Sequence, residues 1–208
     1  MVVPWPEPSD LGRYKCQIQT TIPLMPLTAR QAALAEHLQA NAIRTDGPFT
    51  LRSGAVSDWY LDARQTTFSG AGALLVGAAV LEQLDDVVAV GGLTMGADPV
   101  AIGTAMYASL HGFQLRAFSI RKEVKDHGAG GRLAGPVSPG DRVAMVEDTT
   151  STGGAFFEAI DVAMAEGLEV VQAVVLVDRS GDKVSELMKQ RRLKYSIVLR
   201  PEQLGLNT

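Results

Sequence analysis

The stretch that decides the fold occupies residues 143–154 and reads Val143-Ala144-Met145-Val146-Glu147-Asp148-Thr149-Thr150-Ser151-Thr152-Gly153-Gly154. Its apolar start predicts a buried strand over 142–146, and a helical pattern begins at Ala155. Between strand and helix, from residue 147 on, lies a loop of two acids, four hydroxyl side chains and two glycines. Ligands of open α/β sheets bind outside the carboxyl ends of the strands, so this loop is expected to hold one.

The residue types in this loop indicate the chemistry of the ligand. Backbone N–H groups at a helix N-terminus, together with hydroxyl side chains, can surround a phosphate. Gly153 and Gly154 would let that phosphate approach the backbone closely. Ionised carboxylates only accept hydrogen bonds, so Glu147 and Asp148 favour a ligand that also offers hydroxyl donors. A ribose 5-phosphate has both groups. The structural alternative is an ordinary strand-to-helix turn with an Asp or Thr cap.

Outward from this loop, apolar strands alternate with helices, which indicates a parallel sheet covered on both faces and an α/β fold. A first helix is expected near Thr28, which has capping-box spacing to Gln31. A short hairpin is expected over 49–61, turning at Ser53-Gly54. Further helices are predicted at 72–84, 99–110, 155–165 and 183–191. Further strands are predicted at 87–90, 115–120, 170–177 and 195–199.

The composition limits the class of protein. The chain has 208 residues, of which 46% are hydrophobic, and a net charge of -4. This argues for one domain and against nucleic-acid or membrane-surface partners, which need a basic surface. The single cysteine, Cys16, excludes an internal disulfide and fits a cytoplasmic setting. Residues 1–25 contain no signal-like apolar stretch and are expected to form a poorly ordered extension before a domain at 26–208.

A second loop is basic and rich in glycine. It reads Arg121-Lys122-Glu123-Val124-Lys125-Asp126-His127-Gly128-Ala129-Gly130-Gly131. Its cations suit a pyrophosphate, and its glycines suit a segment that opens and closes over a site. A solvated surface loop is the structural alternative.

Both loops resemble a known family. The acidic-hydroxyl loop resembles the motif with which type I phosphoribosyltransferases bind phosphoribosyl pyrophosphate (PRPP). The basic loop resembles the catalytic loop of orotate phosphoribosyltransferases, Arg-Lys-x-x-Lys-x-His-Gly. The resemblance covers nearly everything from Thr28 to Leu206. It implies a mainly parallel sheet flanked by helices, with a small amino-terminal hood at about 26–65. It also implies transfer of ribose 5-phosphate from PRPP to orotate with Mg²⁺, in a homodimer whose active site is shared between subunits.

The resemblance also implies the roles of individual residues. Those implied to bind PRPP are Arg52, Arg121, Lys122, Lys125, His127, Glu147, Asp148, Thr149, Thr150, Ser151, Thr152, Gly153, Gly154 and Ala155. Lys125, Glu147 and Asp148 are implied in catalysis. Met95 and Gly96 match the pyrophosphate loop. Tyr60, Leu61, Ser151 and Arg179 are implied to contact orotate, and a guanidinium fork suits its carboxylate. Mg²⁺ would be held mainly through PRPP, without direct protein ligands.

The sequence departs from the family at Gly96, where many members carry Lys. One contact to pyrophosphate is therefore missing or replaced, by Arg52 or by a cation of the basic loop. Two other functions remain open at this point. A PRPP-sensing regulatory module on the same fold would need no basic loop. A purine phosphoribosyltransferase would lack the hood and the Arg179 pattern.

Overall fold

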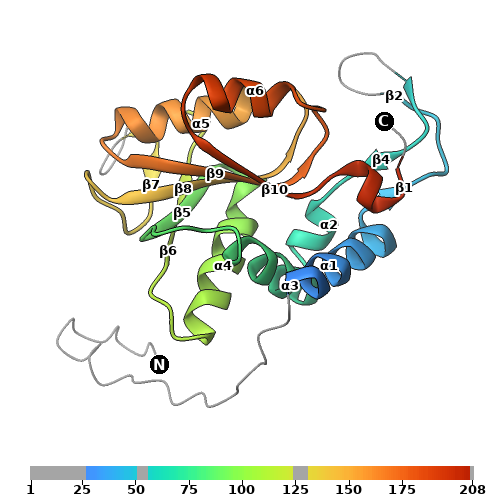
Figure 1. The fold of residues 1–208 in the computed structure, drawn as a ribbon, viewed down its shortest axis with the longest axis horizontal. Helices are drawn as coiled ribbons and strands as arrows, with labels where there is room; N and C mark the ends of the chain where they lie inside the picture. Colours follow the sequence, from blue (N-terminus) through green and yellow to red (C-terminus); the bar gives the residue numbers. More distant parts are fainter. Residues whose placement is uncertain (1–26, 51–55, 124–130, 207–208) are drawn as a thin grey trace, which may run out of the picture.

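The computed structural model of the chain describes residues 27–50, 56–123 and 131–206. At its centre lies a six-stranded sheet with the order β10-β9-β8-β5-β6-β7 (Figure 1). Its strands are β5 (Ala89–Leu93), β6 (Arg116–Ile120), β7 (Leu133–Ala134), β8 (Arg142–Thr150), β9 (Glu169–Asp178) and β10 (Lys194–Leu199). All neighbours are parallel except β6 and β7. The prediction of a mainly parallel α/β sheet is confirmed.

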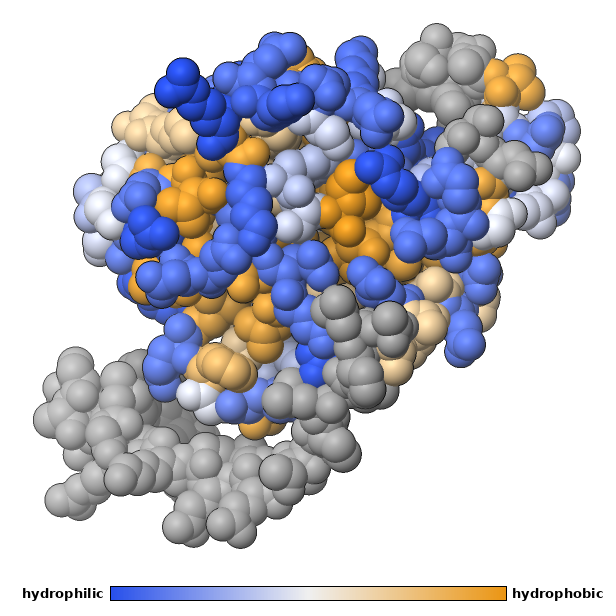
Figure 2. Space-filling model, viewed as in Figure 1, coloured by the Kyte–Doolittle hydropathy of each residue, from blue (hydrophilic) through white to orange (hydrophobic). Residues whose placement is uncertain are grey.

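Two layers of helices cover the sheet (Figure 1). On one face lie α5 (Gly154–Ala165) and α6 (Lys183–Gln190), and on the other α1 (Leu27–Asn41), α3 (Gly70–Leu81) and α4 (Ala97–Leu110). Strand β8 alternates between the two cores, because Met145 packs into the α5–α6 cluster and Val146 into the opposite one. Polar side chains cover the outer side of α6 (Figure 2). No helix in the described part of the chain is long and apolar enough to cross a bilayer.

The hood is built from short elements beside the sheet. Strands β2 (Phe49–Thr50) and β3 (Val56–Ser57) pair antiparallel, as predicted, while the turn between them lies outside the described residues. The rest of the hairpin prediction is wrong, because β4 (Tyr60–Leu61) pairs with β1 (Ile43–Arg44). The Ser57 hydroxyl donates to the Trp59 carbonyl at 2.8 Å, which turns the chain between the two pairs. Helix α2 (Arg64–Thr67) follows directly.

Helices α1 and α3 both begin earlier than the sequence predicts. Helix α1 already begins at Leu27, so Thr28 lies inside it and the capping-box prediction is wrong. The Gln31 amide instead donates to the carbonyl of Val198, 167 residues away, at 3.2 Å. Helix α3 begins at Gly70, because the Ser69 hydroxyl caps it by accepting from an amide in its first turn. The helix ends at Leu81.

Strands β5 and β8 run well past their predicted ends, and both do so toward the same edge of the sheet. Strand β5 includes Gly91 and Gly92, which were expected in a loop. A Cβ on Gly92 would lie 2.2 Å from the Val146 carbonyl oxygen, so glycine lets the strand pass close to β8. Strand β8 runs on through both acids to Thr150, which pairs with Asp178 of β9. The acids are therefore held by a strand and not by a loop.

Candidate active site

A cleft of about 330 Å³ opens at the carboxyl ends of β5 and β8. The hood, the segment after β5, the end of β6 and the start of α5 all border it. Its lining residues are Tyr60, Leu61, Asp62, Ala63, Arg64, Leu93, Thr94, Met95, Gly96, Lys122, Glu147, Asp148, Thr149 and Ala155. The structure thus brings nine of the predicted site residues to one place, namely Tyr60, Leu61, Met95, Gly96, Lys122, Glu147, Asp148, Thr149 and Ala155.

The acidic pair forms the floor of the cleft. Glu147 is only 7% exposed, and Asp148 is half-buried beside it. Burial raises the pKa of Glu147 to about 9, and the charge of Asp148 adds to this rise. Burial also raises the pKa of Asp148, although the Thr149 N–H, which donates to Asp148 Oδ1 at 2.6 Å, opposes the change. Two neighbouring buried carboxylates cannot both ionise easily, so the pair holds a proton at neutral pH.

Gly96 faces this pair from the segment after β5. A Cβ at position 96 would lie 2.7 Å from Asp148 Oδ1 and 3.0 Å from Glu147 Oε1. Neighbouring Met95 follows a cis peptide bond and is 55% exposed. The wall of the cleft opposite the acids is therefore made of backbone.

Asp98, which the sequence analysis missed, fixes the segment after β5 from below. Its carboxylate accepts hydrogen bonds from the hydroxyls of Thr94 and Ser119, each at 2.6 Å. It sits in the first turn of α4, where a negative charge is favoured by the helix dipole. That position was the only available signal, and it does not reveal the two hydroxyl partners.

The predicted hydroxyl loop is shorter than expected. Thr149 and Thr150 belong to β8, and Thr150 is buried. The turn proper comprises Ser151, Thr152 and Gly153, of which the first two are exposed. Gly153 has a φ of 81°, a left-handed conformation that favours glycine, and α5 starts at the next residue. The free N–H groups of a twelve-residue helix thus open beside the cleft.

Arg179 lies beyond the cleft proper, directly after β9. Its backbone N–H donates to the Thr150 carbonyl at 2.8 Å, and its guanidinium stacks 4.6 Å above the Trp59 ring. Burial lowers the pKa of Arg179, while nearby Tyr60 opposes this shift. Among the described residues, no acceptor reaches its buried Nε. The sequence analysis missed Trp59, although it directly precedes the predicted Tyr60.

The other orotate candidates are spread along the hood. Tyr60 is 37% exposed, and its ring centroid lies 5.8 Å from that of Phe49. Leu61 borders the cleft, but its side chain is buried in the core. The contact of Leu61 with a ring stays a prediction.

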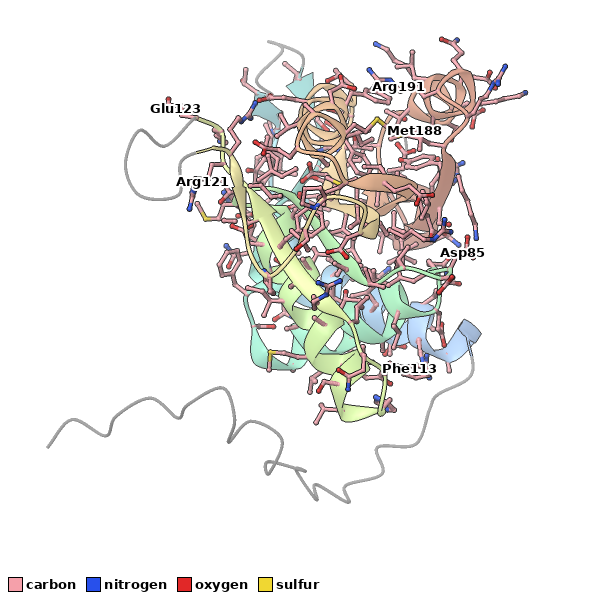
Figure 3. All side chains as sticks on the ribbon, turned by 90° about the vertical axis from the view of Figure 1, so that its left-hand side faces the viewer. Asp85, Phe113, Arg121, Glu123, Met188 and Arg191 are labelled. Carbon is pink, nitrogen blue, oxygen red and sulfur yellow. The ribbon has the colours of Figure 1, made fainter. Side chains whose placement is uncertain are left out.

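The basic residues occupy the end of β6. Lys122 borders the cleft. Figure 3 shows Arg121 just after one end of β6, and Phe113 before the opposite end of this strand. The Arg121 carbonyl accepts a hydrogen bond from Arg132 Nε at 2.6 Å. Three further predicted cations, Arg52, Lys125 and His127, lie outside the described residues.

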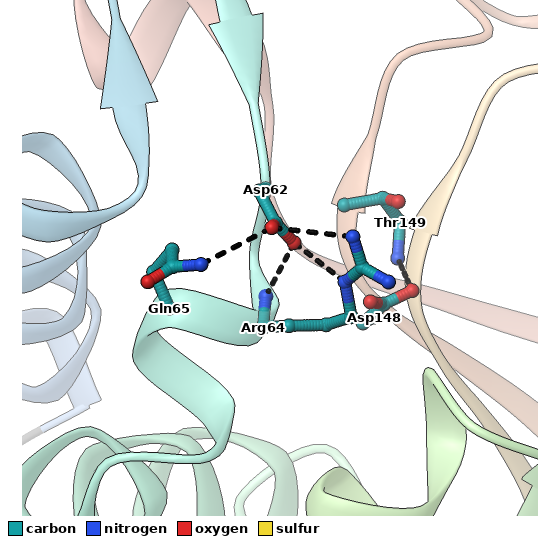
Figure 4. Close-up of polar contacts among 5 residues, drawn as sticks. All are labelled: Asp62, Arg64, Gln65, Asp148 and Thr149. Carbon is teal, nitrogen blue, oxygen red and sulfur yellow. Dashed lines mark hydrogen bonds and ion pairs between the residues drawn. The ribbon is translucent and has the colours of Figure 1, made fainter.

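A further cation, Arg64, was missed altogether. Its Nε donates to Asp62 Oδ1 at 2.7 Å and its Nη2 to Asp62 Oδ2 at 3.2 Å, beside the Asp148 carboxylate (Figure 4). The described residues contain no cluster of three or more His, Cys, Asp or Glu that could hold a metal. The acidic pair can still contact a metal that is bound mainly by a ligand's oxygens.

Comparisons with known proteins agree on one family. The chain is 38% identical over 179 residues to the orotate phosphoribosyltransferase of Streptomyces avermitilis, which covers 85% of this chain and 98% of that relative. The crystal structure of Mycobacterium tuberculosis orotate phosphoribosyltransferase with Fe(III) dicitrate matches with a TM-score of 0.76 and 35% identity, over 85% of this chain and 99% of that one. The same protein in complex with PRPP gives a TM-score of 0.72 and 32% identity, with the same coverage. No protein-family model matches the chain.

A mainly parallel sheet with an acidic pair and a helix N-terminus at its carboxyl edge defines a type I phosphoribosyltransferase. The curated relatives narrow this class, and they favour the catalytic interpretation over the regulatory module. The chain belongs to the orotate phosphoribosyltransferase family.

The acidic pair predicts an unusual dependence of stability on pH. Because the folded-state pKa of Glu147 is raised to about 9, the folded protein keeps a proton that the unfolded chain loses above its ordinary value. The free energy of unfolding should therefore fall as pH rises from about 5 to about 9. Gln at position 147 cannot titrate. The free energy of unfolding of Glu147→Gln should therefore exceed that of the wild type by on the order of 2–4 kcal/mol at pH 8.

Urea denaturation of the ligand-free proteins at pH 5 and pH 8 checks this prediction. The advantage of Glu147→Gln should shrink to about 1 kcal/mol or less at pH 5, because the folded wild type holds the proton there and the unfolded chain, close to its ordinary carboxyl pKa, still binds it in part. Glu36→Gln, which removes one exposed carboxylate from α1, controls for the change in net charge. Equal stabilities of Glu147→Gln and wild type at both pH values would contradict the assignment of a strained acidic pair.

Proposed function

We propose that this chain transfers ribose 5-phosphate from PRPP to a ring nitrogen of orotate. A bond forms between that nitrogen and the anomeric carbon, the bond from this carbon to pyrophosphate breaks, and orotidine 5'-monophosphate and pyrophosphate are released. One observation carries the proposal. The buried acidic pair lies beside the N-terminus of α5, and Arg179, whose Nε has no acceptor among the described residues, follows β9 next to the end of β8.

The acidic pair and the helix end suit the two halves of ribose 5-phosphate. Glu147 and Asp148 would accept hydrogen bonds from the vicinal hydroxyls, because a diol offers two donors to carboxylates. The start of α5, together with Thr149 and the residues up to Ala155, would receive the phosphate on its free N–H groups. Binding at two points fixes the anomeric carbon between them, so positioning supplies much of the rate enhancement.

Charge stabilisation would come from the basic residues at the end of β6. Lys122 borders the cleft, and Arg121, Lys125, His127 and Arg52 are proposed to join it around the pyrophosphate. With both acids of the pair ionised, three carboxylates (Asp62, Glu147 and Asp148) would outnumber the two cations Arg64 and Lys122 among the described cleft residues. A Mg²⁺ on the pyrophosphate and ribose oxygens, next to the acidic pair, would supply further neutralising charge.

Arg179 is proposed to select orotate. Its guanidinium is oriented by stacking on Trp59, and its buried Nε has no acceptor among the described residues. A carboxylate on the substrate ring would satisfy that donor and compensate for the desolvation of the charge. Tyr60 lies close to Arg179, and Ser151 begins the turn beside it, so both would border the ring.

Substrate preference tests this proposal. The wild type should convert orotate and leave uracil, which lacks the carboxylate, essentially untouched. Arg179→Ala should raise the KM for orotate roughly thirtyfold or more, because an unpaired buried carboxylate costs about 2–5 kcal/mol. The KM for PRPP should change far less. Loss of orotate absorbance with PRPP and Mg²⁺ measures both constants.

Arg191→Ala is the matched control. Arg191 also stacks on an aromatic ring, at 4.8 Å from Phe157, but it lies at the end of α6. It should leave both KM values unchanged. Wild-type rates with adenine or hypoxanthine that are comparable to the rate with orotate would contradict the proposed function. An equal rise of both KM values in Arg179→Ala would instead make Arg179 a structural residue.

We further propose that two copies of the chain assemble through α4. Three apolar side chains at four-residue spacing form an exposed row on this helix, namely Ile102 at 53%, Met106 at 61% and Leu110 at 39%. Four-residue spacing places them on one face of the helix. Exposed apolar surface of this kind is typical of a protein interface. In such a pair, the basic loop of one subunit is proposed to act on the ligand of the other subunit.

Ile102→Asp should abolish this assembly, because it buries a charge in an apolar interface. Light scattering after size-exclusion chromatography should show a dimer for the wild type and a monomer for the variant. Activity should fall roughly ten- to a hundredfold, because the monomer would lose about one charge-assisted contact that the partner's loop makes to the substrate. Met164→Asp, at a 45% exposed site on α5, should remain dimeric and active. A fully active monomeric wild type would refute the shared site.

A further inference from the structure

Arg64 borders the cleft from α2, whereas Lys122, the other described cation of the cleft, follows the end of β6. Arg64 is the first residue of α2, directly behind the hood strand that carries Tyr60. It borders the cleft together with Gly96 and Asp148, and it also borders the adjoining hollow that Met95 shares. Its side chain is 49% exposed, so solvent and ligands reach the guanidinium.

The guanidinium is oriented before any ligand arrives. Asp62 accepts hydrogen bonds from Nε and Nη2 of Arg64 and from its backbone N–H at 3.2 Å. The Gln65 amide donates to the same carboxylate at 3.3 Å, which holds Asp62 in turn (Figure 4). Within the described residues, Nη1 makes no hydrogen bond. A fork held on one side leaves its other side available for an anion, and the loss of side-chain entropy on binding is reduced.

Position 96 supplies no cation in this chain, because glycine has no side chain. Any side chain there would begin 2.7 Å from Asp148 Oδ1 and 3.0 Å from Glu147 Oε1. The Thr149 N–H holds the Asp148 carboxylate in place, so a side chain at 96 would displace the acids that are proposed to bind the ribose. Glycine at 96 therefore leaves the pyrophosphate side of the cleft without a cation of its own, and Arg64 faces that same space from α2.

We propose that Arg64 binds the pyrophosphate group of PRPP and so takes the place of the missing cation at position 96. This inference rests on the proposed function. A guanidinium is well suited to the task, because its planar donors match two phosphoryl oxygens at once. The contact stabilises the charge that develops on pyrophosphate as it leaves. Arg64 also lies near Asp148, so the bound pyrophosphate and the ribose hydroxyls meet at this pair of side chains.

The experiment compares ligands that do and do not carry pyrophosphate. Calorimetry measures the affinities of wild type, Arg64→Gln and Arg64→Lys for Mg²⁺-pyrophosphate and for orotidine 5'-monophosphate. Arg64→Gln should weaken pyrophosphate roughly ten- to a hundredfold, and raise the KM for PRPP similarly, because one charge-assisted contact is lost. It should change the affinity for orotidine 5'-monophosphate less than about threefold, since that ligand carries no pyrophosphate. Arg64→Lys keeps the charge but not the planar fork, so its affinity for pyrophosphate should lie between those of the wild type and Arg64→Gln.

Arg142→Ala is the control, because it removes an arginine paired with Glu169 at the opposite end of the sheet. It should bind both ligands like the wild type. Equal losses for the two ligands in Arg64→Gln would mean that Arg64 only positions Asp62 and Asp148, and would overturn the proposal. Unchanged binding of pyrophosphate would overturn it as well. Orotate turnover by the wild type is assayed separately, so failure of the proposed function is recognised independently of the result for Arg64.

Discussion

Glu147 and Asp148 stand side by side at the buried end of β8, and the rest of the cleft depends on this repulsive pair. Burial raises the pKa of both, and the charge of Asp148 adds to the rise at Glu147, so the free protein holds the site at a cost in stability. A strand flanked by neighbours on both sides fixes the two side chains more firmly than a loop could. Ribose hydroxyls and a nearby cation would relieve the strain, so energy stored in the free protein favours binding.

The surrounding residues follow from this constraint. Gly96 leaves the carboxylates room in front of it, and Arg64 borders the same space with positive charge from α2. Arg179 shows the opposite imbalance, since it is a half-buried cation whose Nε lacks an acceptor among the described residues. One end of the site thus calls for hydroxyl donors and the other for an anion, which is the chemistry of a ribose phosphate beside an aromatic carboxylate.

Much of this arrangement was predictable from sequence, because its signals are local. An apolar run, two acids, hydroxyls and glycines are read within one stretch, and their order placed the ligand site at the carboxyl edge of the sheet. The failures involve contacts between distant residues. The acids were expected in a loop, but pairing with β9 extends β8 through them. Trp59 gains its role only when the hood meets Arg179 at the end of β9, and Arg64 only when α2 meets the acids across the cleft. Asp98 is marked only by its place in the first turn of α4, which does not reveal that it binds Ser119 of β6.

The proton held by the acidic pair offers the most direct test of the account. Calorimetric titration with PRPP and Mg²⁺ at pH 7.5, repeated in buffers of different ionisation enthalpy, gives the number of protons released on binding. If hydroxyls and Mg²⁺ favour the ionised pair, the wild type should release up to about one proton more than Glu147→Gln, which has none to lose at that position. Equal proton release by the two proteins, with PRPP bound to both, would contradict the central role assigned to Glu147 and Asp148.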